Sequence, residues 1–114
     1  MNDLFTKKDY SLYSNAMTFM RRPLVQNPVD NDADIVVLGA PFDMATSGRP
    51  GARLGPDAIR RVSVNLAWEG KKFPWDFNVF EHTKVIDSGD LVFDTGDAED
   101  LTVRLEAAAD AILN

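Results

Sequence analysis

The chain contains no cysteine and a single histidine, His82. The absence of cysteine excludes disulfides, thiolate nucleophiles, iron–sulfur clusters and cysteine-ligated zinc. A single imidazole also excludes every metal site that needs two histidines, and it leaves one candidate for a histidine general base. His82 lies beside Glu81 without a serine or cysteine elbow anywhere in the chain, so we expect it to have no catalytic role.

Positive charge and long apolar runs are also scarce. The 114 residues include 12 Lys and Arg against 18 Asp and Glu, which gives a formal net charge of −6. Nucleic acids and anionic membranes bind clustered positive charge, so neither is expected as a partner. The longest charge-free apolar stretch, Ile35–Phe42, is far shorter than the roughly 20 residues that cross a bilayer, and the start of the chain lacks the apolar core of a secretion signal. We therefore expect a cytoplasmic protein.

A strand signal and a glycine-rich loop dominate the middle of the chain. Residues 33–40 are rich in β-branched side chains and apolar at successive positions, which is typical of a central parallel strand buried on both faces. Residues 41–55 contain three glycines and two prolines, which favours a long ordered loop. Asp43 follows the strand directly, at the edge where open parallel sheets bind ligands, and an Asx turn is its alternative role.

Two helices and a second strand are predicted after this loop. Pro56 suits the first turn of a helix because its φ is already helical. The apolar residues that recur on one face of this helix are Ile59, Val62 and Leu66. Residues 83–87 are a weaker strand candidate, closed by residues 88–90, and Asp97 is predicted to cap a helix that runs to residue 114. The alternation of strands and helices is typical of a parallel α/β sheet.

The residues before the first strand are less regular. A short helix is predicted around residues 14–20, and Pro23 and Pro28 then interrupt the chain. We therefore treat residues 1–32 as an N-terminal extension. Residues 33–114 are interpreted as the first part of an α/β domain, with the order βαβα, incomplete at the C-terminal end.

Two clusters of one residue type have structural interpretations. Five aspartates near the second strand suggest a metal site at first, but their spacing does not match a calcium-binding loop. We therefore assign these five aspartates to helix capping and turns. They are Asp87, Asp90, Asp94, Asp97 and Asp100. Five aromatic residues form either an interface patch or a cover over the core. These aromatic residues are Trp68, Phe73, Trp75, Phe77 and Phe80.

Arg49 and Arg53 are the most distinctive residues of the loop. Two guanidinium groups near the N-terminus of a helix can hold an anion. The loop nevertheless lacks both the GxGxxG and the GxxxxGK[ST] phosphate-binding motifs. The alternative is a rigid loop whose arginines pair with carboxylates nearby or across a subunit interface.

Several short motifs together resemble the amino-terminal signature of the ureohydrolases, the family of arginases and agmatinases. The motifs are Gly39–Asp43, Thr46–Arg49, Gly51–Arg53, Gly55–Pro56 and Ala58–Arg60. Three further stretches resemble the bacterial agmatinases of this family: Ser14–Ala16, Val64–Glu69 with Phe73–Trp75, and Val85–Leu91. The resemblance covers nearly all of the chain.

The resemblance implies a three-layer α/β/α fold with a parallel sheet, of which only the first strands and helices are present. It also implies a binuclear Mn²⁺ centre that hydrolyses agmatine to putrescine and urea, in a homo-oligomer. The family's metal ligands lie in motifs that include GGDH and DAHxD, and neither occurs here, so we assign no catalytic or metal-binding residue. We expect the chain to be the amino-terminal part of such an enzyme and inactive by itself. A non-catalytic assembly module and a related guanidino-acid amidinohydrolase are the alternatives.

The resemblance places five residues of the loop at the mouth of the substrate pocket, where they line it or brace it. They are Asp43, Thr46, Ser47, Arg49 and Arg53. Agmatine carries no carboxylate and needs no arginine clamp, which favours a structural role for the two arginines. Asp43 is placed where it could face a cationic substrate.

Overall fold

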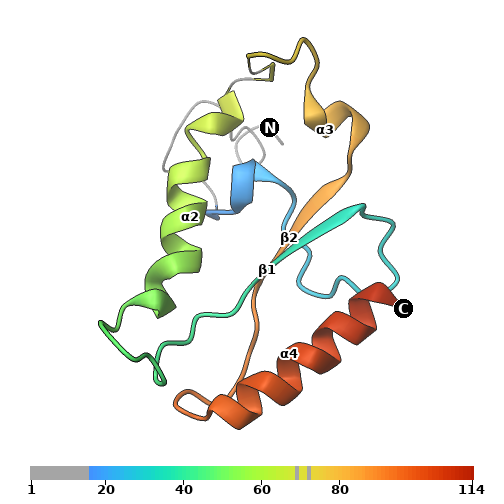
Figure 1. Cartoon of the computed structure of the whole chain (residues 1–114). Coiled ribbons are helices and arrows are strands. Elements are labelled where there is room, and N and C mark those ends of the chain that lie inside the picture. Colours follow the sequence, from blue (N-terminus) through green and yellow to red (C-terminus); the bar gives the residue numbers. More distant parts are fainter. Residues whose placement is uncertain (1–15, 69, 72) are drawn as a thin grey trace, which may run out of the picture.

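The computed structural model describes residues 16–68, 70–71 and 73–114. Within these residues, two strands and three α-helices follow one another (Figure 1). They are β1 (Ile35–Gly39), α2 (Gly55–Ser63), α3 (Val79–His82), β2 (Val85–Asp90) and α4 (Ala98–Leu113). Three short 3₁₀ turns complete the list: η1 (Phe19–Arg21), η2 (Ala52–Leu54) and η3 (Leu66–Trp68). Part of the helix predicted at residues 14–20 lies outside the described residues, and only η1 forms within them.

The two strands pair in parallel, as the sequence predicts. The register aligns Ile35 with Val85 and Val37 with Asp87, and the intervening chain crosses over through α2. The other edge of β2 pairs with residues 23–25, where the Asp87 amide donates to the Pro23 carbonyl and the Val25 amide donates to the Asp87 carbonyl, both at 2.9 Å. Part of the segment that we interpreted as an extension thus covers one edge of the sheet.

The two long helices lie on opposite faces of the strand pair. Figure 1 shows α2 in green and α4 in red on either side of the strands. Successive side chains of a strand point to opposite faces. Asp87 accordingly reaches Arg60 of α2, whereas its neighbour Ser88 lines a cavity with Ala108 and Ala111 of α4. This helix–sheet–helix arrangement is the one that the family resemblance implies.

Helix α2 begins where the sequence predicts but buries a different face. Gly55 and Pro56 open it, and the residues that it buries are the polar Arg60 and Ser63. The Ser63 hydroxyl donates to the Arg60 carbonyl at 2.7 Å and accepts the Met20 amide at 2.9 Å, which fastens η1 to the helix. The apolar side chains Ile59 and Val62 are exposed instead.

The second strand begins two residues later and ends three residues later than predicted, and the last helix is as predicted. Residues 88–90 belong to β2 and do not close it as a turn. The Asp97 carboxylate accepts the Asp100 amide at 3.0 Å and caps α4. The Asp100 carboxylate in turn accepts the Asp94 amide and pairs with Arg104 one turn later. The capping role that we assigned to Asp97 is therefore confirmed.

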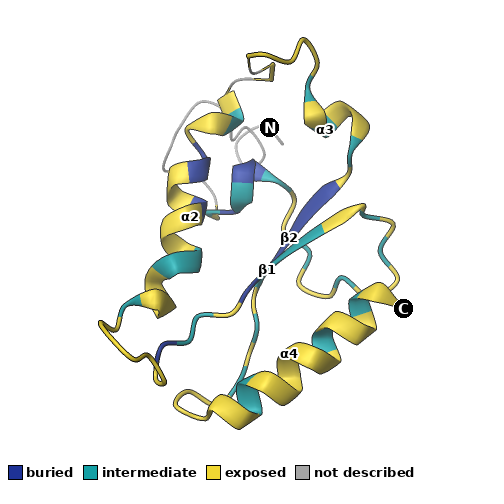
Figure 2. Ribbon diagram, viewed as in Figure 1, coloured by how far each residue is buried: buried dark blue, intermediate teal, exposed yellow. Residues whose placement is uncertain are grey.

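Burial concentrates where β2, η1 and α2 meet, as Figure 2 shows. Among the described residues the buried apolar side chains are Met20, Val64, Val85 and Ile86. β1 does not have the two buried faces that we predicted, because Ile35 is 50% exposed and residues 36–38 are half-buried. Within the described residues β1 has a paired strand on one edge alone, so side chains of a neighbouring strand flank it on one side only.

Candidate functional site

The loop that leaves the carboxyl end of β1 is organised around Asp43. One carboxylate oxygen, Oδ2, accepts the Gly51 amide at 2.7 Å, the Arg53 amide at 3.3 Å and the Arg53 guanidinium at 2.9 Å. Gly51 has a φ of 135°, a conformation that side-chain-bearing residues rarely adopt, and this brings its amide to the carboxylate. The loop therefore closes on the residue at which it begins.

The electrostatics of Asp43 favour its ionised form. Burial by itself would raise the pKa of Asp43. The amide hydrogen bonds from Gly51 and Arg53, together with the Arg53 guanidinium, outweigh burial, so the pKa of Asp43 lies below its usual value. The carboxylate is charged at neutral pH, and its charge binds the Gly51 amide and the Arg53 guanidinium within the loop.

The five residues that we placed at the pocket mouth separate into two groups. Thr46 and Arg53 each contact Asp43: the Thr46 hydroxyl donates to the Asp43 carbonyl at 3.3 Å, and Arg53 pairs with its carboxylate. Ser47 and Arg49 are exposed, and neither forms a hydrogen bond or ion pair within the part of the chain that the structure describes. Pairing with a nearby carboxylate, one of the two interpretations of the loop arginines, thus describes Arg53.

A second group of charges joins α2 to β2, and the sequence pattern did not indicate it. The Arg60 guanidinium donates Nε–H to Asp87 Oδ2 at 2.9 Å and Nη2–H to Asp87 Oδ1 at 3.1 Å. Its Nη1 donates to Asp90 at 2.6 Å, and its Nη2 also donates to the Gly89 carbonyl at 2.8 Å. The turn and capping role that we assigned to Asp90 is therefore wrong. For Asp87 it is incomplete, because this carboxylate pairs with Arg60 and also accepts the Gly89 amide, as in an Asx turn.

The position of Asp87 in the strand explains the error. Asp87 is fully buried, and its carboxylate also accepts the amides of Phe19 at 2.7 Å and Gly89 at 2.8 Å. Burial raises the pKa of Asp87, but Arg60 and the two amides lower it more, and the net pKa is below the usual value. One signal in the sequence could have indicated the buried position of Asp87. It follows two apolar strand residues, and it shares a sheet face with Val85 because side chains two positions apart point the same way.

The carboxyl ends of the two strands are held together at this point. The Leu91 amide donates to the Gly39 carbonyl at 2.8 Å. A Cβ at Gly39 would overlap the Asp90 carboxylate, so only glycine lets Asp90 lie across the end of β1 and reach Arg60. Figure 1 shows the loops after β1 and β2 leaving the same end of the sheet. Open α/β sheets bind ligands at this edge.

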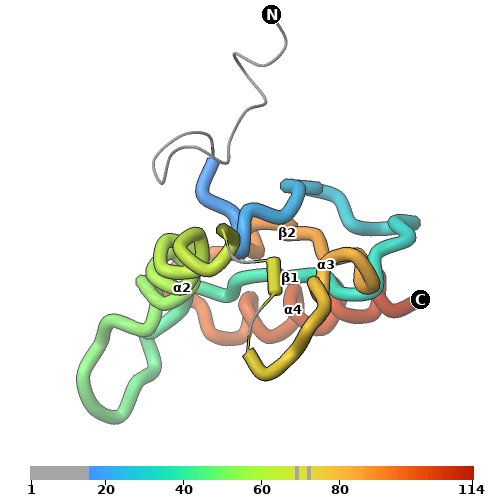
Figure 3. The backbone as a smooth tube through the Cα atoms, turned by 90° about the horizontal axis from the view of Figure 1, so that it is seen from above, coloured from blue at the N-terminus to red at the C-terminus, as the bar shows by residue number. Residues whose placement is uncertain are grey.

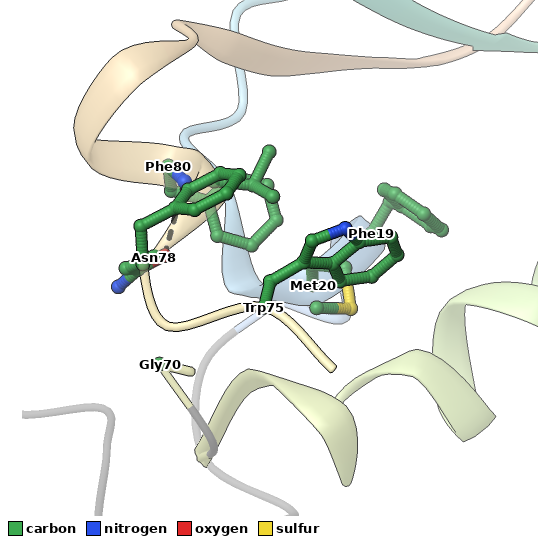
Figure 4. A pocket seen from close by; sticks show the side chains of 8 residues that line it. Phe19, Met20, Gly70, Trp75, Asn78 and Phe80 are labelled. Carbon is green, nitrogen blue, oxygen red and sulfur yellow. Dashed lines mark hydrogen bonds between the residues drawn. The ribbon is translucent and has the colours of Figure 1, made fainter. Parts of the chain in front are cut away.

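The aromatic segment forms an apolar cavity of about 180 Å³ on another part of the molecule. Figure 4 shows Trp75, Phe80 and Phe19 gathered around it, with Met20 beneath. None of the described residues that line the cavity is acidic or basic. Four of the five aromatic residues are exposed, namely Trp68, Phe73, Trp75 and Phe77, so they do not form a closed cover over the core within the described residues.

Within the described ranges, His, Asp and Glu do not gather in any group of three that could hold a metal ion. His82 is exposed, at the end of α3, and its ring meets the edge of Phe77 with the centroids 5.5 Å apart. Among the helices of residues 16–68, 70–71 and 73–114, none is long and apolar enough to cross a bilayer.

The helix–sheet–helix arrangement defines an α/β domain with a loop pinned at the carboxyl edge of its sheet. A sequence profile of the Arginase family matches residues 33–114. The chain therefore belongs to the arginase family, and its fold is the first part of the arginase-like α/β/α fold.

Individual relatives agree with this assignment. The chain is 56% identical to an agmatinase of Edwardsiella ictaluri over 107 residues, which are 94% of the chain and 35% of the relative. It is 53% identical to an agmatinase of Cronobacter sakazakii over 113 residues, which are 99% of the chain and 37% of the relative. The chain thus spans about a third of the length of the curated relatives that it matches.

Solved structures agree as well. A hypothetical agmatinase from Burkholderia thailandensis superposes with a TM-score of 0.80 and 39% identity, over 90% of this chain and 32% of that one. The proclavaminate amidino hydrolase of Streptomyces clavuligerus superposes with a TM-score of 0.78 and 33% identity, over 90% and 34% of the two chains. The resemblance to the ureohydrolases is confirmed.

Proposed function

We propose that this chain is the amino-terminal part of an agmatinase, which hydrolyses agmatine to putrescine and urea and so contributes to polyamine biosynthesis. The observation that carries the proposal is 56% identity to an agmatinase over nearly the whole chain. In this proposal residues 33–114 are the first part of the ureohydrolase domain, residues 1–32 are an extension before it, and the enzyme is a cytoplasmic homo-oligomer.

Membership of the arginase family suggests a metal-dependent enzyme, and we propose that the metal is a pair of Mn²⁺ ions. The residues that the structure describes do not fit such a centre. The two buried carboxylates, Asp43 and Asp87, are each already bound by an arginine and by backbone amides. The proposed centre therefore takes its ligands from outside the described residues.

The contribution of this chain is then the loop at the edge of the sheet. Asp43, Thr46 and Arg53 brace the rim of the pocket, and Ser47 and Arg49 are the residues of the five that remain available to a substrate. A second candidate function is hydrolysis of a carboxylate-bearing guanidino compound. The observation that favours it is the exposed guanidinium of Arg49, which suits a carboxylate better than a cationic amine.

The test is urea release by the product of the full open reading frame, with Mn²⁺ and with agmatine, guanidinobutyrate or arginine as substrate. We expect agmatine to be the preferred substrate. Preference for guanidinobutyrate would support the second candidate, and no urea from any of the three would contradict both. The 114-residue chain by itself serves as the control and is expected to release none.

A further inference from the structure

The loop of residues 44–50 has a single anchor to the rest of the described chain. All seven of its residues are exposed. Within this loop, only the Thr46 hydroxyl forms a hydrogen bond to another described residue, and its acceptor is the Asp43 carbonyl at the base of the loop. Figure 3 shows the loop extending outward from the end of β1, past α2. Its position therefore depends on what holds its two ends.

The two ends meet at the carboxylate of Asp43. The side chain of Asp43 is 1% exposed, and its Oδ2 receives three donors from residues eight and ten positions further along the chain. We call this set of contacts, between the Asp43 carboxylate, the Gly51 amide and Arg53, the clasp. The clasp thus joins the two ends of the loop just before α2 begins in the sequence.

We propose that Asp43 and Arg53 are positioning residues, whose clasp holds loop 44–50 as a preformed rim of the substrate pocket and presents Ser47 to the substrate. The proposal rests on the proposed function and replaces the substrate-contact role that we predicted for Asp43. Holding a contacting group in place before the substrate arrives avoids the entropic cost of ordering it on binding.

Direct contact between Asp43 and a cationic substrate is unfavourable for two reasons. The carboxylate is covered by the loop that it holds, and its Oδ2 already accepts two amides and a guanidinium. A substrate cation would have to displace Arg53 and release the loop at the same time. Ser47, in contrast, lies on the exposed part of the loop and needs no rearrangement to be reached.

The experiment compares four variants of the full-length enzyme. Asp43→Asn keeps the size of the side chain and one acceptor oxygen but removes the charge. Arg53→Met removes the guanidinium, and Arg53→Lys keeps a positive charge. Arg61→Met is the matched control, because Arg61 forms an ion pair of the same length, 2.9 Å, with Asp57 on the exposed side of α2.

Two readouts separate positioning from a general structural role. Amide hydrogen exchange at Gly51 and Arg53 should accelerate about tenfold in Asp43→Asn, as expected when a hydrogen bond to a charged group is weakened. KM for agmatine should rise in Asp43→Asn and Arg53→Met with kcat unchanged, and Arg53→Lys should keep KM nearer to that of the wild type. The control should change neither readout.

The outcomes that overturn the proposal are distinct. Faster exchange with unchanged KM would mean that the rim does not meet the substrate. A fall in kcat at unchanged KM would mean that Asp43 acts in the chemical step. If the wild type releases no urea from any guanidino substrate, the proposed function fails. The exchange rates, which need no substrate, still decide whether the clasp holds the loop.

Discussion

Replacement of Arg60 by methionine removes the guanidinium that joins α2 to β2 but keeps an unbranched apolar side chain on the helix. Four hydrogen bonds are lost, two to the carboxylate of Asp87, one to Asp90 and one to the Gly89 carbonyl. The change therefore leaves the buried carboxylate of Asp87 without its counter-charge. We expect a large loss in the free energy of unfolding.

The exposure of each partner of Arg60 determines how much unfolding free energy is lost. The side chains of Arg60 and Asp87 are 10% and 0% exposed, and removing one partner of such a buried pair costs about 3–5 kcal/mol. The side chain of Asp90 is 40% exposed, so its share is about 1 kcal/mol or less. Asp87 keeps the amides of Phe19 and Gly89, which places the expected cost near the lower end, at about 3 kcal/mol.

The assay is urea-induced unfolding of the protein, followed by tryptophan fluorescence, with Arg61→Met as the control. Arg61 pairs with Asp57 in the open, where both side chains are more than half exposed, so its loss should cost about 0.5 kcal/mol or less. The double variant Arg60→Met/Asp87→Leu should recover part of the loss, because no unpaired charge remains. Equal costs for Arg60→Met and Arg61→Met would refute the reasoning.

Three further predictions concern pH, the last helix and metal binding. The pKa values of Asp43 and Asp87 are lower in the folded than in the unfolded protein, so their stabilisation is complete above the unfolded value of about 3.9 and is lost as the pH falls through the folded values. Urea midpoints measured from neutral to acidic pH should show this loss, and Asp87→Asn should reduce it. Asp97→Ala should destabilise α4 by about 1 kcal/mol, seen as faster amide exchange at Asp100, and an unchanged exchange rate would contradict the cap. The 114-residue chain alone should bind Mn²⁺ only weakly in calorimetry, and tight stoichiometric binding would contradict the assignment of its buried carboxylates to arginines.

The sequence predicted those helices and strands whose positions are set by neighbouring residues in the chain. Pro56 placed the start of α2 within one residue, and Asp97 placed the start of α4, because a fixed φ and a capping carboxylate act on the residues next to them. The run of β-branched residues located β1 in the same way. A parallel pair of strands followed from the alternation of elements, since two parallel strands need a crossover.

The contacts that depend on distant residues were not predictable in this way. Asp87 was assigned to a turn because its partner Arg60 lies 27 positions earlier, and its amide donor Phe19 lies 68 positions earlier. The pairing of residues 23–25 with β2 is equally distant, and two prolines made that segment look irregular. Such contacts become visible only when the strand register is known.

The candidate site shows the same division. The sequence showed that charged residues lie at the carboxyl edge of the sheet. It did not show whether these residues would bind a ligand or pair with another part of the chain. The geometry assigns both buried aspartates to arginines, Asp43 to Arg53 and Asp87 to Arg60. A carboxylate already neutralised by a guanidinium is poorly placed to bind a metal or a cationic substrate, because either would have to displace the arginine from a buried pair. In the function that we propose, these residues therefore hold the shape of the pocket edge, and the reactive groups come from outside the described residues.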